Sequence, residues 1–173
     1  MSFLSFLKKR REDSAAVEIK SPQHNPYREK VLLTVKTSIN GQNEEVEIRE
    51  IRNNRAEVAG AQAVFSFGNE KVPVIVSSPN ANSFSIGINI ALHKSLMDDF
   101  KEELARLKEE GLVSPEAKLS YNPDTRNAIL FRRSDAKIAG NVQKWKDTCT
   151  GNLQTLIDDF SACMPFILKV YGE

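Results

Sequence analysis

Alternation of apolar and polar side chains between residues 31 and 92 is the feature that most restricts the fold of this chain. It is clearest in SFSIGINIAL, residues 83–92, where every second side chain is large and apolar and the side chains between them are small. Successive side chains of a β-strand point to opposite faces of the sheet. A period of two therefore predicts a strand that buries one face and presents the other.

Four further stretches with this period precede it, and turn sequences separate them. They begin near residues 31, 44, 56 and 71, and NGQN, NNR, GNE and PNAN lie between one stretch and the next. Asn, Gly and Pro favour turns because they adopt or impose the backbone angles that turns need. We expect five strands here, the first two forming a hairpin. Pro73 lies inside the fourth stretch; because proline cannot donate a ladder hydrogen bond, it predicts an edge strand or a bulge.

The period changes to 3.6 after residue 94, which is typical of a helix. In SLMDDFKEELARLKEEGL an apolar stripe recurs every three or four positions, from Leu96 to Leu107, and Gly111 marks its end. The outer face is rich in Asp and Glu, and we interpret it as a solvated face. A second hairpin is predicted over AKLSYNPDTRNAILFRR, residues 117–133, because Asn-Pro-Asp has good turn chemistry.

A long helical pattern covers residues 138–171. Proline in a helix removes one hydrogen bond and clashes with the preceding turn, so Pro165 predicts a break or kink near residues 161–165. A second interruption is expected near Gly151, with Thr150 as the cap of a new helix.

Together these patterns predict an α+β domain over residues 30–173, in the order five strands, helix, two strands, helix. We expect a two-layer structure in which two main amphipathic helices pack on an antiparallel sheet of about five to seven strands. Residues 1–29 are expected to form a short N-terminal amphipathic helix and a polar linker that contains Pro22 and Pro26.

Composition and motifs restrict the class of function. A net charge of +1 argues against a dedicated nucleic-acid-binding protein. Cys149 and Cys163 are expected to be buried thiols in a reducing cytosol, and no cysteine and histidine spacing fits a zinc site. The sequence holds no Gly-rich phosphate loop, HExxH, GxSxG or CxxC motif. We therefore expect neither an enzyme nor a cofactor, and we interpret His93 as a residue at a helix start.

Two groups of residues are candidates for binding a partner. The small face of the strand at residues 83–92 would let another backbone approach closely, and it consists of Ser85, Gly87, Asn89 and Ala91. Arg132 and Arg133 belong to a basic set near the second hairpin. That set is the best nucleic-acid candidate in the chain, but a charged outer rim of the sheet is the simpler interpretation.

The first eleven residues are the third candidate. Apolar residues come first and four basic residues follow without an acid between them. This order is the reverse of a secretory signal and suits a helix that lies on a membrane surface or contacts a partner. A plain terminal tail remains the alternative. The residues of this segment are Phe3, Leu4, Phe6, Leu7, Lys8, Lys9, Arg10 and Arg11.

The stretches AVFSFG, VPVIVSS, FSIGINIAL, SLMDDFKEELARLKEEGL, AKLSYNPDTRNAILF and NLQTLIDDFSACMPFIL follow one another over residues 56–171. This succession resembles the type III secretion chaperone-like superfamily, including its YbjN-type members. The two additional strands between Val31 and Ile51 depart from that pattern, and a larger sheet of the PsbP type fits them about as well.

Either resemblance implies a non-enzymatic adaptor or chaperone-like module that binds another polypeptide in the bacterial cytoplasm, with a homodimer left open. The alternative is a peripheral membrane or assembly-scaffold protein attached through residues 1–11.

Overall fold

The computed structural model describes residues 30–52, 55, 58–80, 83–134 and 142–171. These residues form one seven-stranded antiparallel sheet and two α-helices, so the predicted α+β class with an antiparallel sheet is confirmed. The spatial order of the strands is β1-β2-β3-β4-β5-β7-β6. The N-terminal helix predicted within residues 1–29 lies outside the described residues. The elements in chain order are β1 (Val31–Ile39), β2 (Gln42–Arg52), β3 (Val58–Phe67), β4 (Glu70–Asn80), β5 (Ser83–Ala91), the 3-10 turn η2 (Lys94–Leu96), α2 (Met97–Glu109), β6 (Lys118–Asn122), β7 (Asn127–Ser134) and α3 (Val142–Tyr171).

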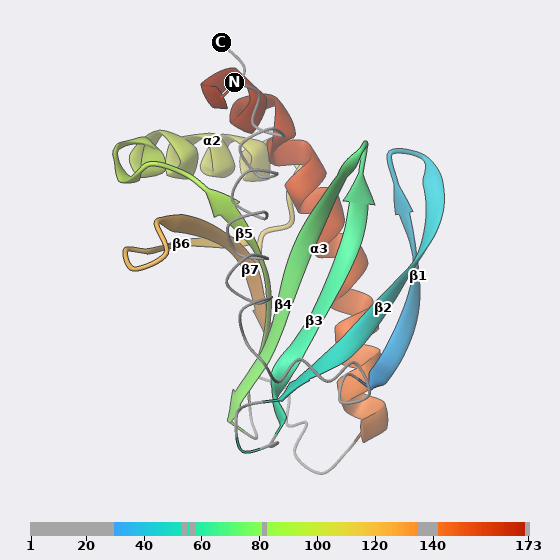
Figure 1. Cartoon of the computed structure of the whole chain (residues 1–173). Coiled ribbons are helices and arrows are strands. Elements are labelled where there is room, and N and C mark those ends of the chain that lie inside the picture. The colour runs from blue at the N-terminus through green and yellow to red at the C-terminus, as the bar shows by residue number, and fades with distance from the viewer. Residues whose placement is uncertain (1–29, 53–54, 56–57, 81–82, 135–141, 172–173) are drawn as a thin grey trace.

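The sheet curls around α3, which runs along its inner face (Figure 1). Helix α3 contacts strands as far apart in the sheet as β1 and β7. The alternating apolar side chains of the strands meet the apolar stripe of α3, as in the edge-to-face contacts of Phe160 with Phe65 and Phe67 at centroid distances of 5.9 and 5.5 Å. Burial of these apolar surfaces is the main force that holds the two layers together.

The edge strand β1 is tied to the same helix by main-chain contacts. The side-chain amide of Gln154 accepts a hydrogen bond from the N–H of Ser38 at 2.8 Å and donates one to its carbonyl at 3.1 Å. Open edges of sheets invite pairing with other chains. At Ser38 the side chain of Gln154 therefore bonds the main-chain groups that a further strand would otherwise bond.

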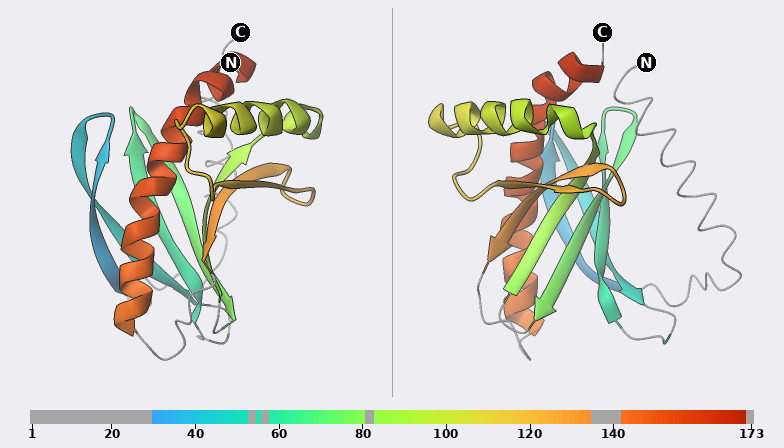
Figure 2. Two further views of the ribbon diagram at one scale, coloured as in Figure 1. Left: turned by 180° about the vertical axis from the view of Figure 1, so that it is seen from behind. Right: turned by 90° about the vertical axis from the view of Figure 1, so that its left-hand side faces the viewer.

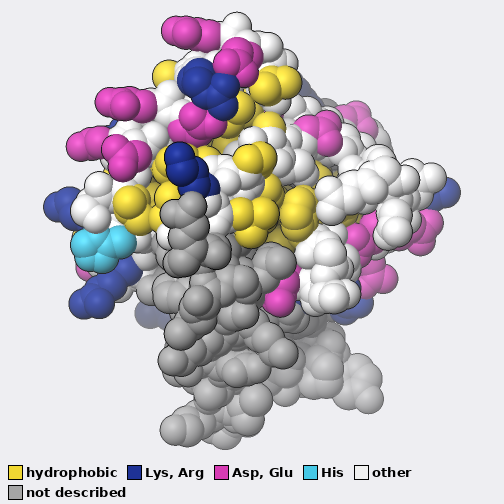
Figure 3. Space-filling view, turned by 90° about the horizontal axis from the view of Figure 1, so that it is seen from above, with side chains coloured by type: hydrophobic (Ala, Val, Ile, Leu, Met, Phe, Trp, Pro, Cys, Tyr) yellow, Lys and Arg dark blue, Asp and Glu magenta, His cyan; other side chains and the backbone are white. Residues whose placement is uncertain are grey.

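Helix α2 crosses the upper end of the molecule, as both views of Figure 2 show. It packs on α3 through stacked rings of Phe100 and Phe166, with centroids 5.1 Å apart. Gly111 ends it with a φ of 71°, and the N–H of Leu112 bonds the carbonyl of Leu107, as predicted for a glycine-terminated helix. Seen from above, acidic side chains lie on the side of α2 and hydrophobic side chains reach the surface beside them (Figure 3).

The break predicted near residues 161–165 and the new helix predicted to start at Thr150 are wrong. Helix α3 is continuous from Val142 to Tyr171, with Pro165 inside it. Thr150 is not a cap, because its hydroxyl donates to the carbonyl of Lys146 one turn earlier, at 2.9 Å. Burial of Cys163, Met164 and Ile167 on either side of the proline outweighs the cost of about 3 kcal/mol that a proline imposes on a helix.

The predicted edge or bulge position of Pro73 is also corrected. Strand β4 lies inside the sheet between β3 and β5. The β4–β5 ladder begins at Val74↔Ile88, so Pro73 lies one residue beyond the part of β4 that pairs with β5. Proline has no N–H to donate, which accounts for the end of this ladder beside it.

Both predicted hairpin turns are confirmed. Asn40 and Gly41 connect β1 to β2 with positive φ angles of 51° and 75°, as a two-residue Asn-Gly turn requires. The Asn122 side chain accepts hydrogen bonds from the N–H groups of Asp124 and Thr125 at 2.9 and 3.3 Å. That Asx turn connects β6 to β7.

Candidate functional site

The outer face of β5 carries three of the four small residues predicted to bind a partner. Ser85, Gly87 and Asn89 line an open groove of about 340 Å³ on the side of the sheet opposite α3. Ala91 does not line the groove and is 3% exposed. The right view of Figure 2 looks onto this side, with α3 behind the sheet. The full lining consists of Ile75, Ser77, Ser85, Gly87, Asn89, Ser120, Ile129 and Phe131.

Gly87 lets the walls of this groove form. A Cβ atom at this position would lie 3.1 Å from Cγ2 of Ile129, 3.1 Å from Cβ of Phe131 and 3.4 Å from the carbonyl oxygen of Leu130. The two separations of 3.1 Å are shorter than ordinary contacts between non-bonded carbon atoms. The two β7 side chains therefore lean over β5 because position 87 has no side chain, and the main chain of β5 forms the floor.

None of the described residues that line the groove is charged. Its walls are apolar at Ile75, Ile129 and Phe131, and its floor is small and polar. Ile75 is 39% exposed, and Val64 on the neighbouring part of the same face is 42% exposed. An uncharged groove with apolar walls suits an apolar or small polar side chain better than a phosphate or a metal ion.

The two predicted arginines are separated by the sheet. Arg133 is exposed on the outer face, paired with Ser85 in the β5–β7 register, so it borders the groove. Arg132 points to the inner face, and its side chain is only 14% exposed. It donates to Oδ1 of Asn152 at 3.0 Å and to the hydroxyl of Ser114. Arg132 is therefore part of the core structure in this arrangement.

Sequence reasoning missed the buried carboxylate that holds this arginine. Asp159 on α3 is 2% exposed, and its two oxygens accept the N–H of Ser114 at 2.8 Å and the hydroxyl of Ser114 at 2.6 Å. Arg132 lies 3.7 Å from Asp159 Oδ2. The signal was present, because Asp159 falls on the apolar stripe of the helix between Leu156 and Cys163, where an acid needs a partner.

Burial raises the pKa of Asp159, and this effect outweighs the opposite influence of the Ser114 hydrogen bonds and of Arg132. The network joins β7, α3 and the loop between α2 and β6. Its groups bond to one another, so the removal of any one of them is expected to destabilise the fold, and we interpret the network as structural.

Other reactive side chains are also accounted for structurally. Burial raises the pKa of the Cys149 and Cys163 thiols to about 12, which keeps both protonated and unreactive near neutral pH. His93 caps the short turn η2, since its Nδ1 accepts the N–H of Ser95 at 3.2 Å. Among the described residues, no group of three or more His, Cys, Asp or Glu could hold a metal ion.

The predicted contact residues Phe3, Leu4, Phe6, Leu7, Lys8, Lys9, Arg10 and Arg11 lie outside the described part of the chain. Within that part, neither helix has the length and apolar character that crossing a bilayer requires.

Comparison with known proteins does not assign the chain to a family. No protein-family model, no curated protein and no solved structure matches this chain.

Proposed function

We propose that this protein is a non-enzymatic polypeptide-binding module of the adaptor or chaperone type. The observation that carries the proposal is the groove on the outer face, whose floor at Gly87 has no side chain and whose walls at Ile129 and Phe131 are apolar. An extended partner segment would lie along this face and place an apolar side chain between the walls. The resemblance to the type III secretion chaperone-like superfamily points the same way.

Asn89 offers a way to test the groove without disturbing the core. It is half-buried, lines the groove and points away from α3, so Asn89→Arg fills the groove and leaves the inner face unchanged. Thr34→Arg is the matched control, because Thr34 is exposed in the edge strand β1 and is not among the groove residues. Both variants should unfold at nearly the wild-type temperature.

The experiment compares the polypeptides that wild type and the two variants retain from a native lysate, identified by mass spectrometry. Polypeptides that wild type and Thr34→Arg retain but Asn89→Arg loses would support the proposal. Equal retention by all three proteins, or no retention by any, would overturn it.

A second candidate function is attachment to a membrane surface through residues 1–11. The observation that favours it is the sequence itself, in which apolar residues precede four uninterrupted basic residues. Removal of residues 2–11 should abolish sedimentation with vesicles that contain anionic lipid. Vesicle binding that is absent in the full chain, or unchanged by the deletion, would exclude this role.

A further inference from the structure

Strands β2 and β3 separate along their upper halves, although both belong to one sheet. Their ladder runs from Arg52↔Val58 only to Ile48↔Ala63. Above it, within the described part of the chain, β2 continues to Gln42 and pairs with β1 alone, while β3 continues to Phe67 and pairs with β4 alone. We call the space between these two unpaired halves the seam. Figure 1 shows the two hairpins diverging there.

The seam contains a pocket of about 350 Å³ between the tips of the two hairpins. Residues of the β1–β2 hairpin supply one side, and Ser66 and Gly68 supply the other. Most of these side chains carry amide or hydroxyl groups. The lining consists of Ile39, Asn40, Gln42, Asn43, Glu44, Ser66 and Gly68.

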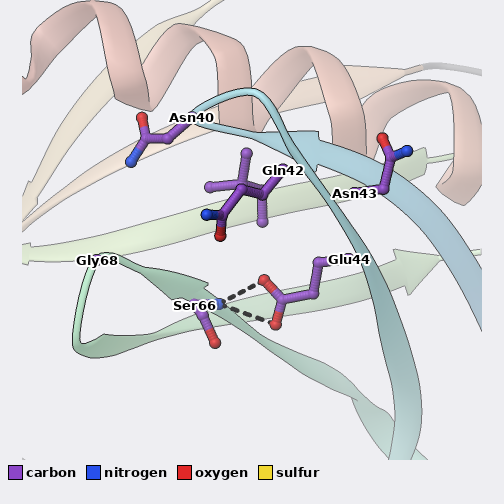
Figure 4. A pocket seen from close by; sticks show the side chains of 7 residues that line it. Asn40, Gln42, Asn43, Glu44, Ser66 and Gly68 are labelled. Atoms are coloured by element: carbon purple, nitrogen blue, oxygen red, sulfur yellow. Dashed lines mark hydrogen bonds between the residues drawn. The ribbon is translucent and has the colours of Figure 1, made fainter.

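In the seam, a side chain accepts a main-chain hydrogen bond that a neighbouring strand would normally accept. Both carboxylate oxygens of Glu44 accept the main-chain N–H of Ser66, at 3.2 and 3.0 Å (Figure 4). In a continuous sheet a main-chain carbonyl of the neighbouring strand would accept this hydrogen bond. Since alternate residues of a strand direct their main-chain groups to the same side, Val64 also faces β2, at the point where the β2–β3 ladder ends with Ile48↔Ala63.

Glu44 brings to this position a carboxylate that has no cationic partner in the part of the chain that the structure describes. It is the single charged residue among the described residues that line the pocket. No lysine or arginine that the structure describes forms an ion pair with it: Lys36 pairs with Glu45 instead, and the ammonium of Lys71 contacts the hydroxyl of Ser66 on the outer face. A ligand with a positively charged group would complement the seam.

We propose that the seam is a second binding site, which accepts an extended polypeptide segment that carries a lysine or arginine. The inserted segment pairs its main chain with β3 at Ser66, above the end of the β2–β3 ladder. One of its carbonyls takes the hydrogen bond from Ser66, and its basic side chain pairs with the released carboxylate of Glu44. This is strand addition to an open sheet position. It rests on the proposed function only in taking a polypeptide as the ligand, because it uses none of the groove residues.

Main-chain pairing can be tested separately from side-chain binding. Heptapeptides are selected from a random phage-displayed library on the wild-type protein, and the tightest one is synthesised with a fluorophore for anisotropy. In one series, N-methyl groups replace the amide hydrogens at every second position; in the matched series, they replace those at the intervening positions. We expect a loss of about tenfold or more in affinity for one series and little change for the other, since only one edge of the segment pairs with β3.

The role of Glu44 is tested with the same peptide in a double-substitution cycle. Replacement of its basic residue by norleucine should weaken binding to wild type by about tenfold, and should have little effect on binding to Glu44→Gln. Asn89→Arg, which blocks only the groove, should leave the affinity unchanged.

Three outcomes would overturn the inference about the seam. Equal affinity of both methylated series would show that the protein does not bind the main chain of the peptide along one edge. A norleucine effect that persists in Glu44→Gln would show that the Glu44 carboxylate does not contact the basic residue. Loss of binding in Asn89→Arg would show that the peptide binds in the groove. The proposed function would then stand, but the binding site in the seam would not. Selection of no peptide at all would count against both.

Discussion

Two junctions of the same sheet differ in how completely they are closed. Strand β5 pairs with β7 from Phe84 to Ala91, and β7 is fastened to α3 behind it by Arg132, Ser114 and Asp159. Strands β2 and β3 pair only along their lower halves, with Glu44 spanning the upper gap.

Each junction has a carboxylate that accepts a main-chain N–H, but their surroundings differ. Asp159 is 2% exposed and lies 3.7 Å from an arginine. Glu44 is half-buried, lines a pocket and has no cation in ion-pair contact among the described residues. The comparison teaches that a buried polar group with every partner supplied stabilises a fold, whereas one that lacks a partner is available to a ligand.

Removal of the two carboxylates should give the largest contrast. Asp159→Ala leaves Arg132 without its buried carboxylate partner, so that only the exposed Glu116 remains beside it among the described residues, and leaves the Ser114 N–H without an acceptor. We therefore expect a loss of about 3–5 kcal/mol in the free energy of unfolding. Glu44→Ala removes one accessible acceptor and should cost about 1 kcal/mol or less. Urea unfolding measures both, and similar losses would break the comparison. Asp158→Ala, at the exposed neighbouring position, is the control.

The glycine at the closed junction should be hard to replace. Gly87→Ala places a methyl group 3.1 Å from two β7 side chains, and overpacking of this kind typically costs about 1–3 kcal/mol. Gly151 in α3 has no neighbouring atom within 4 Å of an added Cβ, so Gly151→Ala should stabilise the protein by about 0.5–1 kcal/mol. Thermal unfolding of the two variants should show shifts of opposite sign.

Thr37 allows a further test near the open junction between β2 and β3. It pairs directly with Glu44 across the β1–β2 ladder and is 3% exposed. Its hydroxyl is the buried side-chain group of the described residues that has no hydrogen-bond partner. Thr37→Val removes this unsatisfied hydroxyl at almost constant volume and should stabilise the protein by about 1 kcal/mol. Thr34→Val, at an exposed position of the same strand, should change little; destabilisation by Thr37→Val would contradict this account.

The free energy of unfolding should depend on pH differently in wild type and in a variant whose residue 159 does not titrate. Its pKa is raised in the folded state, so the charged form is disfavoured there relative to the unfolded chain. This cost is absent below the unfolded pKa of about 3.9 and grows as the pH rises to the folded pKa. The charged groups that face it are Arg132 from β7 and Asp158 from α3, with Glu116 of the α2–β6 loop 3.8 Å from Arg132.

Asp159→Asn retains an acceptor for the Ser114 N–H and does not titrate. Relative to this variant, wild type should therefore gain stability as the pH falls from 7 toward 4. Urea unfolding of both proteins over this range measures the difference. A constant difference would mean that the pKa of Asp159 is not raised, and a decreasing one would mean that Arg132 dominates over burial.

Much of the fold follows from local patterns that a reader of the sequence can see. A period of two between residues 31 and 92 predicts strands, a period of 3.6 after residue 94 predicts a helix, and Asn40-Gly41 and Asn122-Pro123 predict turns. These predictions hold because side-chain direction and turn angles depend on neighbours in the sequence. The same alternation placed Ser85, Gly87 and Asn89 on one face of a strand, where they line the groove.

What the tertiary structure decided concerns partners that are distant in the sequence. Arg132 and Arg133 are adjacent in the chain, but only the positions of Asp159 and Ser114 show that one of them belongs to the core. Pro165 is accommodated in a continuous helix because its neighbours are buried against the sheet. The seam exists because β1–β2 and β3–β4 pair well as separate hairpins and only partly with each other. Sequence patterns record which residues prefer burial, but the distance at which two segments finally meet depends on how all the buried surfaces fit together.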